Sequence, residues 1–231
     1  MFELSYTESE AVFLSLKVAL FAVGLSLPLG IFVAWVLARM EFPGKTVLDA
    51  IIHVPLVMPP VVVGYLLLLL LGRKGILGSW IYDTFGVTIG FSWQGAAVAA
   101  AVMSFPLMVR AIRLSIEAID PHLEQAARTL GAGRLDVFFS VTLPLAGSGV
   151  VVGAILAFAR ALGEFGATIT FVSAIPGETN TLPISLYTIV QTPGEDTGAI
   201  RLVALSLVIA FGAMFAAEVI SRRVRKRITG S

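Results

Sequence analysis

Gln125-Ala126-Ala127-Arg128-Thr129-Leu130-Gly131, followed further on by Val141-Thr142-Leu143-Pro144, is the stretch that most restricts what this chain can be. It belongs to a polar segment, punctuated by glycine, that lies between long apolar runs. A membrane protein rarely keeps such a segment unless another molecule docks on it. The stretch therefore predicts a membrane-spanning chain with a docking loop at one of its faces.

The docking loop begins with signals for a helix. Asp120 is suited to cap the helix N-terminus, and Pro121 is suited to the first helical position. Residues at helical spacing then share one face, and these are Leu123, Ala126, Ala127 and Leu130. Gly131 is expected just past the helix end. A second short helix is expected to carry Leu135, Phe138 and Phe139 on one face and to stop near Pro144.

Composition places the rest of the chain in a bilayer. Hydrophobic residues make up 57% of the sequence and charged residues 13%, whereas a soluble domain carries about 25% charged residues. Residues 1–10 are acidic and lack the basic region of a cleaved signal peptide, so the first apolar run is expected to remain as a span. The formal net charge of +1 gives no general attraction for nucleic acid.

Five stretches are apolar enough to span a bilayer, which takes about 20 residues. They are 18–38, 50–71, 86–109, 147–173 and 202–217. The shorter stretch 182–192 is expected to be a re-entrant or interfacial helix. No soluble domain is visible, so residues 1–231 are expected to form a single transmembrane domain. Its core would be 11–221, its docking loop 115–146 and its basic tail 222–231.

The basic residues orient these spans by the positive-inside rule. With the docking loop in the cytoplasm, the cytoplasmic side also receives most of the basic residues: Arg39, Lys45, Arg110, Arg113, Arg128, Arg134, Arg222, Arg223, Arg225, Lys226 and Arg227. The other side receives Lys17, Arg73, Lys74 and Arg201. The expected topology therefore has a periplasmic N-terminus and a cytoplasmic C-terminus.

The sequence argues against several kinds of chemical site. It contains no cysteine, which excludes disulfides, thiol catalysis and thiolate metal sites. His53 and His122 have no partner at zinc spacing. Gly44-Lys45-Thr46 mimics the end of a phosphate-binding loop, but Arg39 stands where that motif needs its first glycine. We therefore expect no metal, no cofactor, no catalytic residue and no enzymatic activity.

The docking loop resembles the cytoplasmic loop of bacterial ABC-importer permeases, which carries Glu-Ala-Ala, then glycine, then Ile-x-Leu-Pro. The matching positions are Gln125, Ala126, Ala127, Gly131, Val141, Leu143 and Pro144. Gln125 replaces the usual glutamate and removes a charge, and Val141 replaces isoleucine. The resemblance implies that a separate ATPase grips this loop. The alternative interpretation is an interfacial hairpin that only connects two spans.

Beyond the loop, the chain resembles molybdate permeases of the sulfate/molybdate branch nearly end to end. The pattern Arg160-Ala161-Leu162-Gly163-Glu164-Phe165-Gly166 is shared with sulfate permeases. Pro176-Gly177-Glu178-Thr179 and Gln191-Thr192-Pro193-Gly194 look more like molybdate permeases. The family implies a homodimer in the bacterial inner membrane, with cytoplasmic ABC ATPase subunits and a periplasmic oxyanion-binding protein.

Polar and helix-breaking residues inside the spans are candidates for a pathway or gate. Arg160 and Glu164 are four residues apart on one expected helix, so their side chains can meet, and intramembrane charges usually face a bundle interior or a pathway. Pro59, Pro60 and Gly64 interrupt the expected span 50–71, and Gly163 and Gly166 flank Glu164 in the expected span 147–173. The alternatives are an ion pair that pins two helices and plain helix packing.

The sequence thus predicts an all-α polytopic bundle with five transmembrane helices and a cytoplasmic coupling loop, similar to type I ABC-importer permeases. Its function would be import of molybdate, with tungstate as a second candidate, by alternating access driven by a separate ATPase. A sulfate or thiosulfate permease is the closest alternative. A secondary transporter that uses no ATP and an integral-membrane enzyme are alternatives from other classes.

Overall fold

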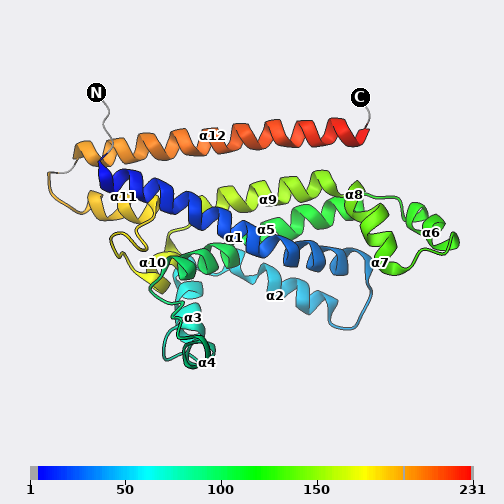
Figure 1. The fold of residues 1–231 in the computed structure, drawn as a ribbon, viewed down its shortest axis with the longest axis horizontal. Helices are drawn as coiled ribbons and strands as arrows, with labels where there is room; N and C mark the ends of the chain where they lie inside the picture. The colour runs from blue at the N-terminus through cyan, green and yellow to red at the C-terminus, as the bar shows by residue number, and fades with distance from the viewer. Residues whose placement is uncertain (1–4, 195, 230–231) are drawn as a thin grey trace.

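The computed structural model describes residues 5–194 and 196–229, and every regular element in this part of the chain is a helix (Figure 1). The elements are α1 (Tyr6–Arg39), α2 (Lys45–Val57), α3 (Pro60–Leu71), α4 (Ile76–Phe85), α5 (Trp93–Glu117), α6 (Pro121–Thr129), α7 (Arg134–Val137), the π-helix η1 (Phe138–Thr142), α8 (Leu143–Leu145), α9 (Gly147–Leu162), α10 (Gly166–Val172), α11 (Leu182–Val190) and α12 (Asp196–Thr229). The predicted all-α fold is confirmed.

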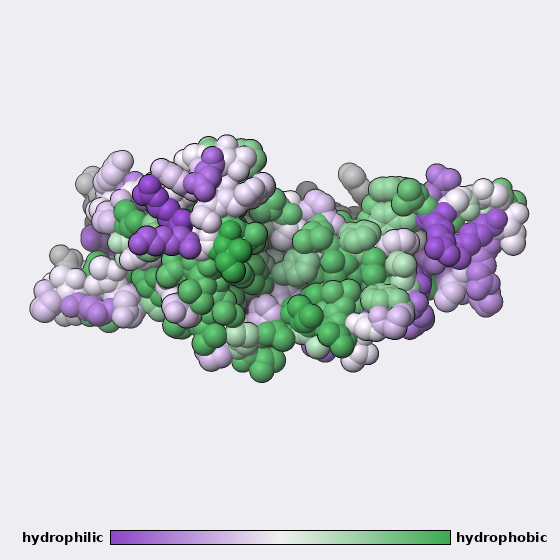
Figure 2. Space-filling view, turned by 90° about the horizontal axis from the view of Figure 1, so that it is seen from below, coloured by the Kyte–Doolittle hydropathy of each residue, from purple (hydrophilic) through white to green (hydrophobic). Residues whose placement is uncertain are grey.

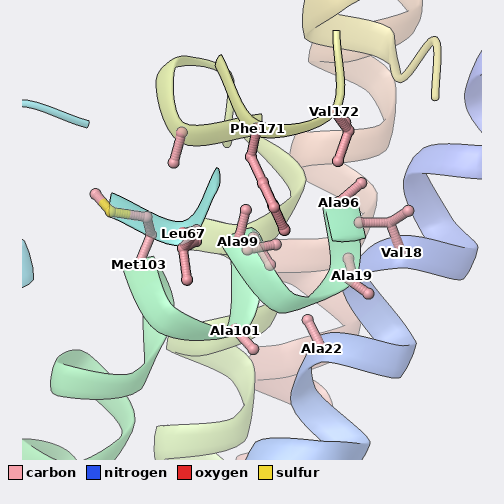
Figure 3. Close-up of a cluster of buried hydrophobic side chains, with 14 of the residues drawn as sticks. Val18, Ala19, Ala22, Leu67, Ala96, Ala99, Ala101, Met103, Phe171 and Val172 are labelled. Atoms are coloured by element: carbon pink, nitrogen blue, oxygen red, sulfur yellow. The ribbon is translucent and has the colours of Figure 1, made fainter. Parts of the chain in front are cut away.

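The central helix is α5, which packs against α1 on one side and α9 on another. Its first half is rich in alanine, and Ala96, Ala99 and Ala100 are fully buried. Small side chains let neighbouring helices approach closely, which is how helices associate where lipid replaces water. Figure 3 shows this region, where Ala96 and Ala99 of α5 meet Phe171 of α10 and Val18 of α1.

The molecule has the surface of a protein that crosses a membrane several times. Among the described residues, α1, α5 and residues 197–216 of α12 are long and apolar enough to span a bilayer. Two bent pairs of helices raise the number of spans to 5 if each pair counts as one. An apolar surface lies between hydrophilic surfaces at the two ends (Figure 2). The predicted multi-pass architecture is confirmed.

The predicted spans differ in their bounds from the observed helices, and the stretches 50–71, 86–109 and 147–173 each contain a break or a non-helical part. The stretch 86–109 is helical only from Trp93, because the Ser92 hydroxyl accepts a hydrogen bond from the Gly95 N–H at 3.2 Å and caps α5. The stretch 147–173 is not one helix, because α9 ends at Leu162 and α10 begins at Gly166. The short stretch 182–192 does form a separate helix, α11. Helix α4 was not predicted at all.

Candidate functional site

Helix α6 forms where the sequence predicts it. The Asp120 carboxylate accepts a hydrogen bond from the His122 N–H at 2.9 Å, and Pro121 occupies the first helical position. At the other end Gly131 adopts a left-handed φ of 92°. Its N–H donates to the Arg128 carbonyl at 3.0 Å, and the Ala132 N–H donates to the Ala127 carbonyl at 3.1 Å. This pair of bonds is the Schellman motif that ends a helix at glycine.

The apolar face of α6 is exposed. The side of the helix that carries Leu123 and Leu130 has no cover within the described chain, and the two leucines are 50% and 88% exposed. Gln125 and Ala126 are exposed as well. In Figure 1 α6 projects from one end of the molecule, next to α7. Helix-in-groove recognition between proteins uses exposed apolar side chains of this kind.

The second half of the docking loop ends as predicted but differs in its faces. The helical segment 134–145 ends at Leu145, one residue after Pro144, and the chain then bends by 69° into α9. Proline has no N–H and excludes the carbonyl four residues earlier, so the turn before it widens: the Leu143 N–H donates to the Phe138 carbonyl, the spacing of a π-helix. The expected common face is split, because Phe138 packs against Trp35 while Leu135 and Phe139 are exposed.

The buried residue of α6 is Glu124, which was not among the site residues predicted from the sequence. Its Oε1 accepts hydrogen bonds from Arg39 Nε at 3.0 Å and from the Thr142 hydroxyl at 2.8 Å. Arg39 Nη2 also donates to the Ile119 carbonyl at 3.1 Å. A cavity of about 300 Å³ lies beside Glu124. Another cavity, of about 360 Å³, lies near Glu8 and Arg201, away from the docking loop. Glu124 thus joins α6 to the end of α1 and to η1.

Arg160 and Glu164 form the predicted ion pair, with Arg160 Nη1 and a Glu164 carboxylate oxygen 2.6 Å apart. The prediction that both lie on one helix is wrong, because Glu164 lies in the break between α9 and α10. Its other oxygen accepts a hydrogen bond from the Ala167 N–H at 2.9 Å and so caps α10. The Glu164 side chain is 2% exposed and that of Arg160 is 28% exposed. The pair therefore connects the end of α9 to the start of α10 across the break between them.

A second break lies across from it. Helices α2 and α3 meet at 115°, at Met58 and Pro59, and Pro60 is the first residue of α3. Helices α3 and α10 then cross closely. A Cβ on Gly64 would lie 2.5 Å from the Ala167 carbonyl oxygen, and a Cβ on Gly166 would lie 2.7 Å from Cβ of Pro60. Close packing therefore explains both glycines.

Gly163 differs from these two glycines. A Cβ at this position would approach only the Ala159 carbonyl oxygen, at 4.0 Å, so no close approach requires glycine there. The residue follows the end of α9 and opens the break that contains Glu164. Among the described residues, no three side chains of the metal-binding types come together as a metal site.

Residues 26–226 match the family described as binding-protein-dependent transport system inner membrane component. The chain belongs to this family. The match covers the broken helices, the docking loop and most of α12. The family's function is transport rather than catalysis, in keeping with the predicted absence of an enzymatic role.

Relatives in this family resemble the chain over nearly its whole length. It is 61% identical to the molybdenum transport system permease protein ModB of Escherichia coli K12, over 95% of this chain and 96% of that protein. It is 52% identical to the ModB protein of Haemophilus influenzae, over 96% of each. The sulfate transport system permease protein CysT of Escherichia coli K12 is 34% identical, over 87% of this chain and 72% of that protein.

Solved structures of ABC importers share the fold. The structure of a bacterial ABC transporter for the import of alginate matches with a TM-score of 0.76 at 17% identity, over 95% of this chain and 80% of that chain. The MetNI methionine ABC transporter in an inward-facing conformation matches with a TM-score of 0.70 at 19% identity, over 94% of each chain. The fold is therefore that of an ABC-importer permease.

Proposed function

We propose that this chain is the channel-forming subunit of an ATP-driven importer of molybdate, a tetrahedral dianion, with tungstate as a second substrate of the same charge and shape. One observation carries the choice of substrate. The chain is 61% identical to a molybdenum permease over 95% of its length but 34% identical to a sulfate permease over 87%. A permease for sulfate or thiosulfate is the remaining alternative.

The exposed face of α6 supports a separate ATPase as the source of energy. In the proposed mechanism the ATPase binds α6 through Gln125, Ala126 and Ala127, and Gly131 ends the contact. Movement of the ATPase is passed through the π-turn and the bend that contain the remaining residues of the motif, Val141, Leu143 and Pro144. The spans then switch between inward-facing and outward-facing states, and the chain itself breaks no bond.

The proposed assembly contains a second copy of this chain, ABC ATPase subunits on the cytoplasmic side and a periplasmic protein that delivers the oxyanion. A solved relative provides a parallel, since the alginate transporter has been crystallised in complex with a substrate-bound periplasmic protein. We place the N-terminus in the periplasm and the C-terminus in the cytoplasm of a bacterial inner membrane. The docking loop, residues 40–44 and the end of α12 lie at the same end of the molecule, which supports this orientation (Figure 1).

We place the anion pathway beside the two helix breaks. Irregular backbone at membrane depth is tolerated where it is buried or lines a cavity. The breaks bring together Pro59, Pro60, Gly64, Gly166 and the Arg160–Glu164 pair, with Gly163 at the end of α9. Glu164 is bound to Arg160 and to a backbone N–H, and its negative charge reduces the positive charge that an anion meets. Weak attraction suits a pathway that the anion must also leave.

Uptake of radiolabelled molybdate tests the substrate. Cells that lack their own importer would express this chain with its ATPase and binding protein, with and without excess sulfate. We expect uptake that persists in excess sulfate, because the sequence is nearer to molybdate permeases. Uptake that sulfate abolishes would assign the chain to sulfate instead.

The same assay examines the pathway residues through the double variant Arg160→Gln/Glu164→Gln. A glutamine at 164 still accepts the Ala167 N–H, and removing both charges leaves no unpaired charge buried. We expect a severalfold higher KM for molybdate with an unchanged amount of folded protein, because the anion loses its positive partner. An unchanged KM would remove Arg160 from the pathway and leave it with a purely structural role.

A further inference from the structure

The contact between Glu124 and Arg39 connects parts of the chain that are 85 residues apart in sequence. The Glu124 side chain is 9% exposed and that of Arg39 is 15% exposed, so water screens the pair weakly. Glu124 also accepts a hydrogen bond from Thr142, which is 1% exposed. One carboxylate oxygen therefore binds both a residue of α1 and a residue of η1.

This contact is what holds α6 to α1. Within the described residues the two helices do not pack along their lengths, so the ion pair bridges them. Arg39 is the last residue of α1, and nearby Leu37 is fully buried in a cluster with Met108 and Ile112 of α5. The end of α1 is thus fixed in the core, while the side of α6 opposite Glu124 is exposed. The pair gives a displacement of α6 a direct path to α1, beside the contact of Phe138 in η1 with Trp35 of α1.

We infer that Glu124 is a positioning residue that transmits movement of α6 to the membrane helix α1 through Arg39, and to η1 through Thr142. The inference deepens the proposed function, since it rests on an ATPase that moves α6. Movement of the docking loop also passes along the chain itself, because the loop is joined to α5 at one end and to α9 at the other. The contacts of Glu124 add a second route. With this contact, α1 follows the ATPase together with α5 and α9.

The chemistry of the pair suits a contact that transmits movement. A guanidinium holds its donors in a fixed plane, and here Nε binds Glu124 while Nη2 binds the Ile119 carbonyl, just before α6. Lysine has a single charged nitrogen on a flexible stem and does not reproduce this geometry. Charge-assisted hydrogen bonds of this kind are about twice as strong as neutral ones. The contact therefore orients α6 as well as holding it.

The test compares Arg39→Gln, Glu124→Gln and the double variant in the complete complex, reconstituted with its ATPase and binding protein. The readout is the number of anions transported per ATP hydrolysed. We expect each single variant to lower this ratio about fivefold or more, a typical coupling strength, while the ATPase still co-purifies. The double variant should have a transport ratio no lower than that of the more impaired single variant, because the two substitutions remove the same contact. Independent, additive losses would overturn the inference.

Glu117→Gln is the matched control. Glu117 accepts a hydrogen bond from Arg113 at 2.7 Å near the same end of the bundle, but it lies at the end of α5, and among the described residues no hydrogen bond or ion pair joins it to α6. This variant loses an ion pair without breaking the proposed path, so its transport ratio should stay close to that of the unmodified complex. A loss equal to that of Glu124→Gln would show that any broken ion pair at this end has the same effect.

A second readout needs no transported anion. The sequence has no cysteine, so Met40→Cys provides a single thiol site per chain next to Arg39. We expect ATP to change its rate of labelling by a thiol reagent in the assembled complex, and Glu124→Gln to reduce that change about fivefold or more. An ATP-dependent change that Glu124→Gln leaves intact would overturn the inference. This result would stand even if the substrate proved to be an anion other than molybdate.

Discussion

Gly131→Asp is expected to abolish transport while the chain still inserts into the membrane and binds its ATPase. Gly131 has a φ of 92°, a conformation that costs an L-residue roughly 1–2 kcal/mol. The Schellman bonds that end α6 depend on this conformation. A Cβ at this position projects into open space, so the new carboxylate is presented beside the exposed face of α6. We expect uptake to fall by a factor of at least about 10, equivalent to about 1.4 kcal/mol, while ATP hydrolysis continues.

Gly44→Asp is the control for this result. Gly44 has a nearly identical φ of 91°, and a Cβ there also meets open space. It lies at the same end of the molecule, in the turn before α2, but outside the docking loop. The two variants therefore introduce the same residue with a similar backbone cost. Normal uptake by Gly131→Asp, or an equal loss in Gly44→Asp, would contradict a specific coupling role for Gly131.

Gly64→Val is expected to have the largest effect on folding. A Cβ at Gly64 would lie 2.5 Å from the carbonyl oxygen of Ala167, 2.9 Å from Cα of Ala167 and 2.9 Å from Cβ of Thr170. Two of these atoms belong to the backbone and have no rotamer to change, so α3 and α10 must separate. Overpacking typically costs about 1–3 kcal/mol, and we expect at least the upper end of that range. The measurement is the fraction of monodisperse protein that survives heating in detergent.

Gly24→Val is the matched control for packing. Gly24 lies in the middle of α1, and a Cβ there meets no atom within 4 Å. Both substitutions add the same β-branched side chain to an apolar helix, so they share its intrinsic helix cost. Gly24→Val should therefore retain nearly all of its thermal stability. Equal stability of the two variants would mean that α3 and α10 do not cross as closely as the structure shows.

Local features of the fold were predictable from the sequence because local interactions produce them. The cap at Asp120 and the glycine end at Gly131 depend on residues within a few positions of each other. The break at Pro59 follows from proline chemistry alone, although the angle of 115° between α2 and α3 does not. The Arg160–Glu164 contact was predictable from a spacing of four residues, even though Glu164 lies outside the helix.

The tertiary features were not predictable in this way. The sequence shows that Arg39 and Glu124 are charged, but their pairing depends on how α1 and the docking loop fold onto each other. The same holds for Gly64 and Gly166, whose role appears only when α3 crosses α10. The π-turn before Pro144 was also missed, because sequence rules place a helix end near a proline but do not show how the preceding turn widens.

In the proposed mechanism a separate ATPase drives this chain by binding α6. Site-specific photo-cross-linking can detect this contact, with a photoreactive residue at Gln125 of α6 or, as the control, at Tyr187 of α11. Both positions are exposed, and they lie towards opposite ends of the molecule (Figure 1). We expect a cross-link to the ATPase from position 125 and none from position 187. No cross-link from position 125 in a complex that still hydrolyses ATP and imports the anion would contradict it.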